Sequence, residues 1–175
     1  MAKESTVSCM PKTGHASASL RTTLTSHDYA KLIRWLGWHR HRVLFNRTQV
    51  QKLLFICYGV ELAAGRLIFN ESPRMFPFGP VFAKSYRRTF AIGIPRLSDM
   101  EKDRFVKHPE TLRNITNLVN RYWNVSASEF TRWSHQDGTP WHKTFSEQIR
   151  LEWGAEIKTE YVEEYFKSDK WQIGL

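Results

Sequence analysis

The sequence predicts a mainly α-helical fold: a compact helical domain with a buried central helix and one short β-hairpin-like element. Apolar residues recur with a helical period in several segments between residues 26 and 167. The segment that follows residue 46 is apolar nearly all round, which is typical of a helix in the middle of a core. Extended character is limited to two short runs, 66–70 and 74–78, and prolines confine any pairing there to an edge.

The first helix is expected to begin near Ser26, which can cap it, with Asp28 close to its positive end. An apolar stripe then follows at i, i+3, i+4 and i+7, formed by Tyr29, Leu32, Ile33 and Leu36. The central helix is expected to begin at a capping-box variant formed by Asn46 and Gln49, and to stop at Gly65.

The corner "MFPFGPV" (75–81) follows the second extended run. We expect run 66–70 to pair with run 74–78, and Pro80 to occupy the first position of another helix. Gly79 removes side-chain bulk at the turn, and Phe76 and Phe78 are expected to point their rings into the core. This interpretation makes the corner a rigid element that defines the fold.

Helical patterns resume at 98–107, 109–123 and 126–134, the last opened by a capping box of Ser126 and Glu129. Segment 135–141 is predicted to be a turn in which Trp141 anchors the loop in the core. A last helix is expected over 159–167, capped by Thr159.

The chain of 175 residues suits one domain, and we expect a mobile tail over 1–24 and a single domain over 25–175. The N-terminal segment lacks the apolar region of a secretory signal, and the longest apolar run (53–60) is too short to span a membrane. Cys9 and Cys57 form neither a disulfide framework nor a metal-binding spacing. These features predict a cytoplasmic protein of a reducing compartment that does not enter the membrane.

A formal net charge of +9 is unevenly placed along the chain. Basic residues without acidic neighbours lie at 31–60 and 74–98, interleaved with aromatic residues, whereas segment 152–164 is acidic. Such a pattern attracts nucleic acid or an acidic protein, and it also occurs on ordinary solvated surfaces. The candidate partner-binding residues are Arg40, Arg42, Arg47, Lys84, Arg87 and Arg88.

The sequence shows no recognisable catalytic motif. It has no glycine-rich phosphate loop, zinc-protease motif or nucleophile elbow. His39 and His41 lack further ligands at metal-binding spacing, and we expect His135 to serve the turn that it opens. Cys57 lies among apolar residues, where cysteine is usually inert. We therefore expect no enzyme activity, cofactor or metal.

The order of several motifs resembles that of the SocA-like or Panacea antitoxin domain, a phage-associated protein family, over residues 27–167. The resemblance lies in a leucine-rich helix, an aromatic-Gly-Pro-Val corner and a His…Pro-Trp segment. The matching residues are Val50, Gln51, Lys52, Leu53 and Leu54, then Leu67, Ile68 and Phe69, then Phe78, Gly79, Pro80 and Val81, then Ser126, Ala127, His135, Pro140 and Trp141. The chain departs from the family at Ser134, where threonine is common, and before Gly79, where tryptophan or tyrosine is common.

This resemblance implies an antitoxin that neutralises a toxin encoded by a neighbouring gene, through direct protein–protein binding. It also implies that the signature residues are structural. Two other functions stay open at this point. The chain could be a nucleic-acid-binding transcriptional regulator, whose affinity for duplex DNA would fall steeply as salt is raised. It could also be a proteolytic adaptor that delivers its partner for degradation.

Overall fold

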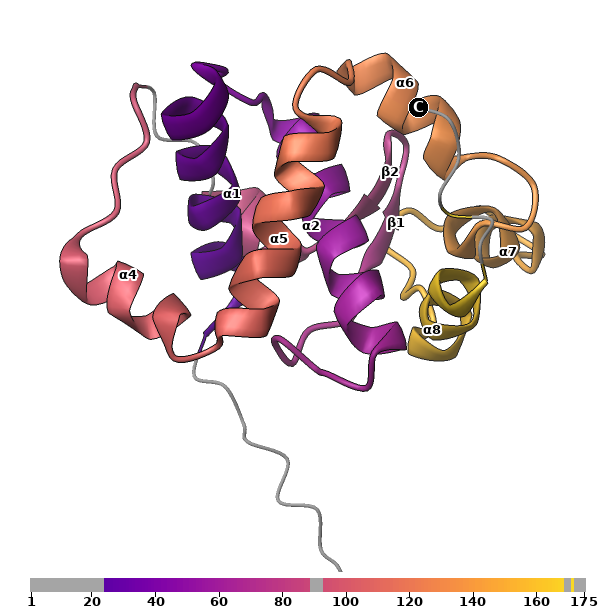
Figure 1. Cartoon of the computed structure of the whole chain (residues 1–175). Helices are drawn as coiled ribbons and strands as arrows, with labels where there is room; N and C mark the ends of the chain where they lie inside the picture. Colours follow the sequence, from indigo (N-terminus) through magenta and orange to yellow (C-terminus); the bar gives the residue numbers. More distant parts are fainter. Residues whose placement is uncertain (1–23, 89–92, 169–170, 172–175) are drawn as a thin grey trace, which may run out of the picture.

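Helix α2 (Arg47–Ala63) is the centre of the fold, and eleven of its residues are buried. It packs against α1 (Ser26–His41), α5 (Pro109–Tyr122), α6 (Ala127–Ser134) and α8 (Thr159–Lys167) (Figure 1). Gly59 allows α8 to come close, because a Cβ there would overlap the Phe166 ring. The prediction of a buried central helix opened by Asn46 and Gln49 is confirmed, with both halves of that capping box formed.

The computed structural model describes residues 24–88, 93–168 and 171. Within these residues it contains eight helices and one two-stranded sheet, so the mainly helical fold class is confirmed. The remaining elements are β1 (Arg74–Phe76), β2 (Gly79–Val81), α3 (Ala83–Arg88), α4 (Asp99–Val106) and α7 (Pro140–Ser146). Residues 1–23 of the predicted tail lie outside the described residues, while Leu24 packs in the core. None of the described helices is long and apolar enough to cross a membrane.

The N-terminal caps of α1 and α8 differ from the prediction. The N-cap of α1 is Thr25, whose hydroxyl accepts from the Asp28 amide at 3.3 Å while the Asp28 carboxylate accepts from the Thr25 amide at 2.8 Å. Ser26 is therefore free to donate to the Glu71 carboxylate, across 45 positions of sequence. Thr159 is the first residue inside α8, and its predecessor Lys158 provides no side-chain cap.

The hairpin pairs β1 with β2, with Met75 opposite Pro80 and Phe76 opposite Gly79. The predicted pairing of 66–70 with 74–78 is wrong, and so is the placement of Pro80 at the start of a helix, which begins instead at Ala83. Pro77 and Phe78 form the loop without a positive φ, and Gly79 directly after them has a φ of 96°, as in a type I turn followed by a glycine at a bulge position. A residue without a Cβ is suited to this backbone conformation, so the turn falls before Pro80.

The far edge of β1 is covered by the segment before α8. The Met75 amide donates to the Ala155 carbonyl at 2.8 Å, the Gly154 amide donates to the Met75 carbonyl at 2.7 Å, and the Ile157 amide donates to the Pro73 carbonyl at 2.9 Å. The hairpin is therefore held on this edge by a part of the chain about 80 positions away.

Helices α4, α5 and α6 lie where the sequence predicts them, and the capping box of Ser126 and Glu129 is confirmed. The predicted turn over 135–141 is shorter than expected, because Pro140 is the first residue of α7 and Thr139 caps it by accepting from the His142 amide at 3.2 Å. Trp141 therefore lies in a helix, where it is buried.

Candidate functional site: the hairpin turn and its buried support

The hairpin turn is held by side chains that come from three different helices. Four of them bind backbone groups of residues 76, 78, 80 and 82, every second residue along the hairpin. Gln51 and Lys52 from α2 bind groups of Phe82 and Pro80, Trp141 from α7 binds the Phe76 carbonyl at the end of β1, and Thr131 from α6 makes a longer contact of 3.5 Å with the Phe78 carbonyl in the loop. These side chains give partners to backbone groups that a two-stranded hairpin leaves unpaired.

Gln51 binds the end of the hairpin with both ends of its amide. Its Oε1 accepts from the Phe82 amide at 2.8 Å, and its Nε2 donates to the Ser85 hydroxyl at 2.8 Å. That hydroxyl in turn donates to the Phe82 carbonyl at 3.0 Å. Gln51 thereby joins the end of β2 to the first turn of α3, which explains an amide in the middle of an apolar helix.

Lys52 is the most unusual residue of the described core, since a lysine is rarely buried without an acidic partner. Only 1 % of it is exposed, and its Nζ donates to the Pro80 carbonyl at 3.2 Å. Burial lowers the pKa of Lys52 to about 7. At neutral pH the amine is therefore close to the balance between its charged and neutral forms.

Trp141 and His135 support the hairpin from the opposite side. The Trp141 Nε1 donates to the Phe76 carbonyl at 2.9 Å, and its ring stacks on the His135 imidazole with centroids 3.8 Å apart. Burial, followed by the charges of Lys52 and His142, lowers the pKa of His135 and so favours the neutral imidazole. Its buried Nε2 has no hydrogen-bond partner in the described structure, and its contact with Trp141 is one of stacking.

Gly79 brings Lys52 and Ser134 close together. A Cβ on Gly79 would lie 2.6 Å from Lys52 Cε, 2.9 Å from Lys52 Nζ and still closer to Ser134 Oγ. A serine beside a lysine of lowered pKa is a known arrangement for a nucleophile and its base. Here, however, each of the two residues is only 1 % exposed, and Ser134 Oγ donates to the Thr131 carbonyl at 3.0 Å. Both side chains are thus enclosed and bind backbone carbonyls, Lys52 that of Pro80 in the hairpin and Ser134 that of Thr131 in α6.

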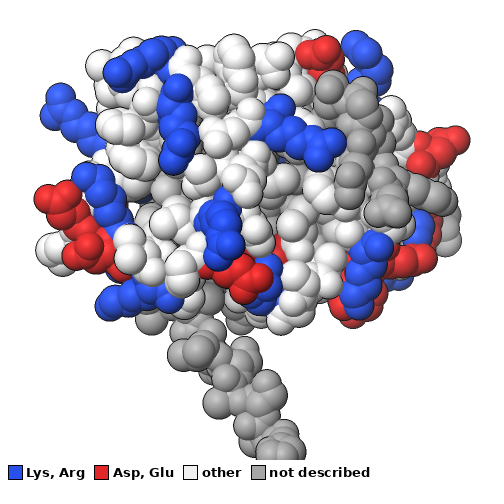
Figure 2. All heavy atoms as spheres, in the orientation of Figure 1, with Lys and Arg blue, Asp and Glu red and all other residues white. Residues whose placement is uncertain are grey.

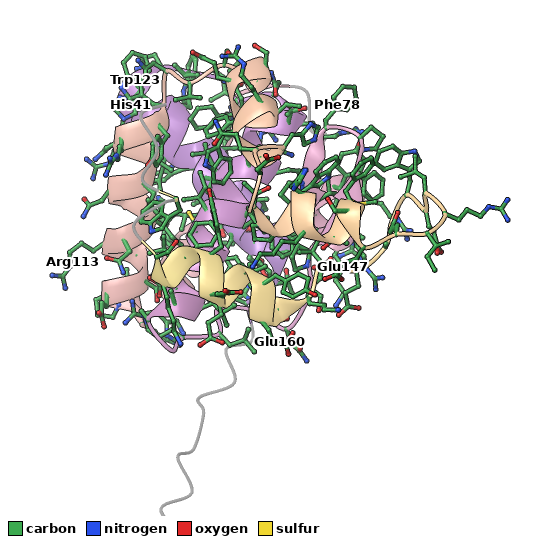
Figure 3. All side chains as sticks on the ribbon, turned by 90° about the vertical axis from the view of Figure 1, so that its right-hand side faces the viewer. His41, Phe78, Arg113, Trp123, Glu147 and Glu160 are labelled. Carbon is green, nitrogen blue, oxygen red and sulfur yellow. The ribbon has the colours of Figure 1, made fainter. Side chains whose placement is uncertain are left out.

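The turn places the Phe78 side chain on the surface, where 66 % of it is exposed. The prediction that the rings of Phe76 and Phe78 both point into the core is wrong: Phe76 is half-buried, and Phe78 projects from the molecule (Figure 3). Beside the turn lies a groove of about 480 Å³ between α6 and the start of α2. We call it the Phe78 groove, and it is lined by Thr48, Phe78, Ala127, Ser128, Thr131 and Arg132.

The groove belongs to an end of the molecule where basic side chains predominate. We call this the basic end, after Arg40 and Arg42 at the end of α1, Arg47 at the start of α2, Arg121 at the end of α5 and Arg132 on α6. Figure 2 shows basic side chains over both halves of one face, including the upper half, where α1 and α5 end, and most of the acidic ones in its lower half. Phe78 lies at the same end as His41 and Trp123 (Figure 3). The rings of His41 and Trp123 stack with an interplanar angle of 2°.

The six basic residues predicted to bind a partner come from three helices. Arg40 and Arg42 lie at the end of α1, and Lys84, Arg87 and Arg88 are on α3. Arg47, at the start of α2, stacks on the Tyr86 ring of α3, with its Cζ 4.6 Å from the ring centroid. Helix α3 packs beside α1, and the Lys84 amide shares the Glu71 carboxylate with Ser26 in the first turn of α1. That turn is about 24 Å from the far end of the 16-residue helix.

The sequence reasoning did not identify Thr131 and Arg132, which line the groove. The signal available was weak, because Arg132 is a single basic residue next to an ordinary amphipathic stripe. It also missed Glu61, a buried carboxylate bound by Arg66, Thr111 and Asn114. Among the described residues, no group of three or more His, Cys, Asp or Glu side chains is placed to hold a metal ion.

Comparison of the chain with protein-family models, curated proteins and solved structures finds no match.

Proposed function

We propose that the chain is an antitoxin of the Panacea type that neutralises a cognate toxin by direct binding. One observation carries the proposal: the buried polar side chains of the motif-bearing segments bind the backbone of a turn that exposes an aromatic ring. Gln51, Lys52 and Trp141 are all used in this way. In this proposal these motif residues serve to position a binding surface.

Neutralisation by binding requires only a surface that is complementary to the toxin in shape and charge. Aromatic and arginine side chains are enriched in the centres of such surfaces. The exposed Phe78 ring, with Arg132 beside it in the groove, supplies this combination. The resemblance of the sequence to the antitoxin family and the character of this surface support the same function.

The test is co-expression of the chain with the product of the neighbouring gene. We expect that product alone to arrest growth and the pair to restore it. Immunoblotting of the toxin then separates two mechanisms, because occlusion leaves its abundance unchanged and proteolytic delivery lowers it. A neighbouring product that is not toxic, or that stays toxic in the presence of this chain, removes the proposal.

The basic end also favours a second candidate, a regulator that binds nucleic acid. Five arginines around exposed aromatic side chains could contact phosphates and stack on bases. This candidate predicts binding to duplex DNA whose affinity falls steeply as salt is raised. An electrophoretic mobility assay at low salt that detects no complex removes it.

A further inference from the structure

We propose that the Phe78 groove binds an acidic segment of a protein partner that inserts one large apolar side chain. The inference rests on the proposed function, because the partner it describes is the toxin. It goes beyond that function by naming the surface and the chemistry of the segment that fits it. The surface that this segment would contact has an apolar part and an electrostatic part.

The apolar part comes from the shape of the groove. Phe78 forms one wall and is 66 % exposed, while short side chains such as Ala127, Ser128 and Thr131 line the rest. The Thr131 hydroxyl already donates to the Ala127 carbonyl at 2.9 Å, so its methyl group is what the groove offers to an apolar ligand. A volume of about 480 Å³ accommodates a large side chain. Insertion of such a side chain would remove apolar surface of that side chain and of Phe78 from water.

The electrostatic part comes from arginines whose charges are not neutralised within the described structure. Arg132 lines the groove and makes no salt bridge there, although its charge interacts with the nearby Glu129 carboxylate. Arg40, Arg42 and Arg121 make no salt bridge in the described structure either, and the same holds for Lys84, Arg87 and Arg88 on α3. The only acidic residue from 118 to 132 is Glu129. Its carboxylate is engaged by the amide and hydroxyl of Ser126. Carboxylates of a partner fit this surface, and arginine binds them with two parallel hydrogen bonds.

Other occupants fit less well. A second copy would set one basic end against another, and like charges repel. The chain's own residues 1–23 hold Lys3, Lys12 and Arg21 against one acid, Glu4, so they carry the same sign as the groove. Nucleic acid needs open ring faces for stacking, but His41 already covers one face of Trp123.

The experiment measures binding of the purified product of the neighbouring gene to the full chain by calorimetry. Phe78→Ala and Arg132→Glu alter the groove, while Ile149→Ala and Arg113→Glu are matched controls. Ile149 is fully exposed, and Arg113 lies on α5 at the end opposite Phe78 (Figure 3). We expect each groove variant to raise Kd at least tenfold and each control to change it less than twofold. Because the Phe78 ring is mostly exposed, the melting temperature of Phe78→Ala should match that of the wild type.

Two results separate failure of the inference from failure of the proposed function. If the groove variants bind and neutralise as the wild type does, the groove inference is overturned and the antitoxin proposal stands. The same holds if binding is lost instead in the variant with Lys84, Arg87 and Arg88 changed to glutamate, which would place the partner on α3.

If the wild type does not bind the neighbouring product, the antitoxin proposal fails and a synthetic probe tests the groove alone. The probe is a fluorescent peptide with one tryptophan flanked by aspartates and glutamates, compared by anisotropy with its asparagine–glutamine counterpart. Equal binding of the two peptides, or no effect of Phe78→Ala on the acidic one, overturns the inference. Displacement of the acidic peptide by duplex DNA also overturns it, because the surface would then be a nucleic-acid site.

Discussion

Substitution of Gly79 by alanine should destabilise the protein more than any other single-methyl change in the hairpin. Two costs add at this position. The positive φ of 96° is unfavourable for a residue with a Cβ by about 1–2 kcal/mol. The new Cβ would also overlap Ser134 Oγ and lie 2.6 Å from Lys52 Cε. Overpacking among buried side chains such as Lys52 and Ser134 costs about 1–3 kcal/mol. The sum is about 2–5 kcal/mol.

A matched control separates the two costs. Gly65 has a φ of 77°, and a Cβ there would meet nothing within 4 Å, so Gly65→Ala carries only the backbone cost. Urea denaturation followed by tryptophan fluorescence gives the free energy of unfolding of both variants, provided that the slope with urea is unchanged. We expect Gly79→Ala to lose at least 1 kcal/mol more than Gly65→Ala, about the lower limit for overpacking.

The double variant Gly79→Ala with Ser134→Ala tests the same reasoning from the other side. Removing Ser134 Oγ takes away the atom closest to the new methyl group, so the two changes should couple favourably by about 0.5–3 kcal/mol, as contacting residues do. Equal losses for Gly79→Ala and Gly65→Ala, together with additive behaviour of the double variant, would refute the argument that steric overlap at Gly79 fixes the turn.

Two further predictions concern buried charge. Burial lowers the pKa of Lys52 to about 7, far below that of a lysine in the unfolded chain. Above pH 7 the unfolded state therefore binds more protons than the folded state, and the free energy of unfolding should rise with pH toward pH 10. The free energy of unfolding should change by at most about 1.4 kcal/mol per pH unit, and urea titrations at several pH values should show that Lys52→Met abolishes this rise. Glu61→Ala removes a carboxylate bound by Arg66, Thr111 and Asn114 and should cost about 2–4 kcal/mol, discounted from the usual range because Arg66 is one-third exposed. A loss below 1 kcal/mol in thermal unfolding would mean that water replaces these hydrogen bonds.

The sequence predicts the helices well where local signals define them. The capping boxes at 46–49 and 126–129 are formed by residues three positions apart, so the sequence alone reveals both partners. Helix α7 was missed because seven residues are too few to show a helical period of apolar residues. Pro140 is also as typical of a turn as of the first residue of a helix. The pairing of β1 was wrong because three-residue strands carry no pattern of their own, and their partners are chosen by distant parts of the fold.

The candidate site was predicted in part. Gln51 and Lys52 were singled out by a resemblance, although their position in an apolar helix was already a physical signal that each must find a buried partner. The partners, backbone groups of residues 80 and 82, could not be read from the sequence, since they depend on where the hairpin turns. The exposure of Phe78 follows from the same turn, and for that reason it was predicted wrongly.

The long-range support of the hairpin has a consequence for synthesis of the protein. The hairpin is held by residues 28 to 31 positions before it and by Trp141, 65 positions after Phe76, while its other edge waits for residues 154–157. Two strands of three residues are not stable alone in water. A nascent chain therefore completes the support of the Phe78 turn only after residue 157 has left the ribosome.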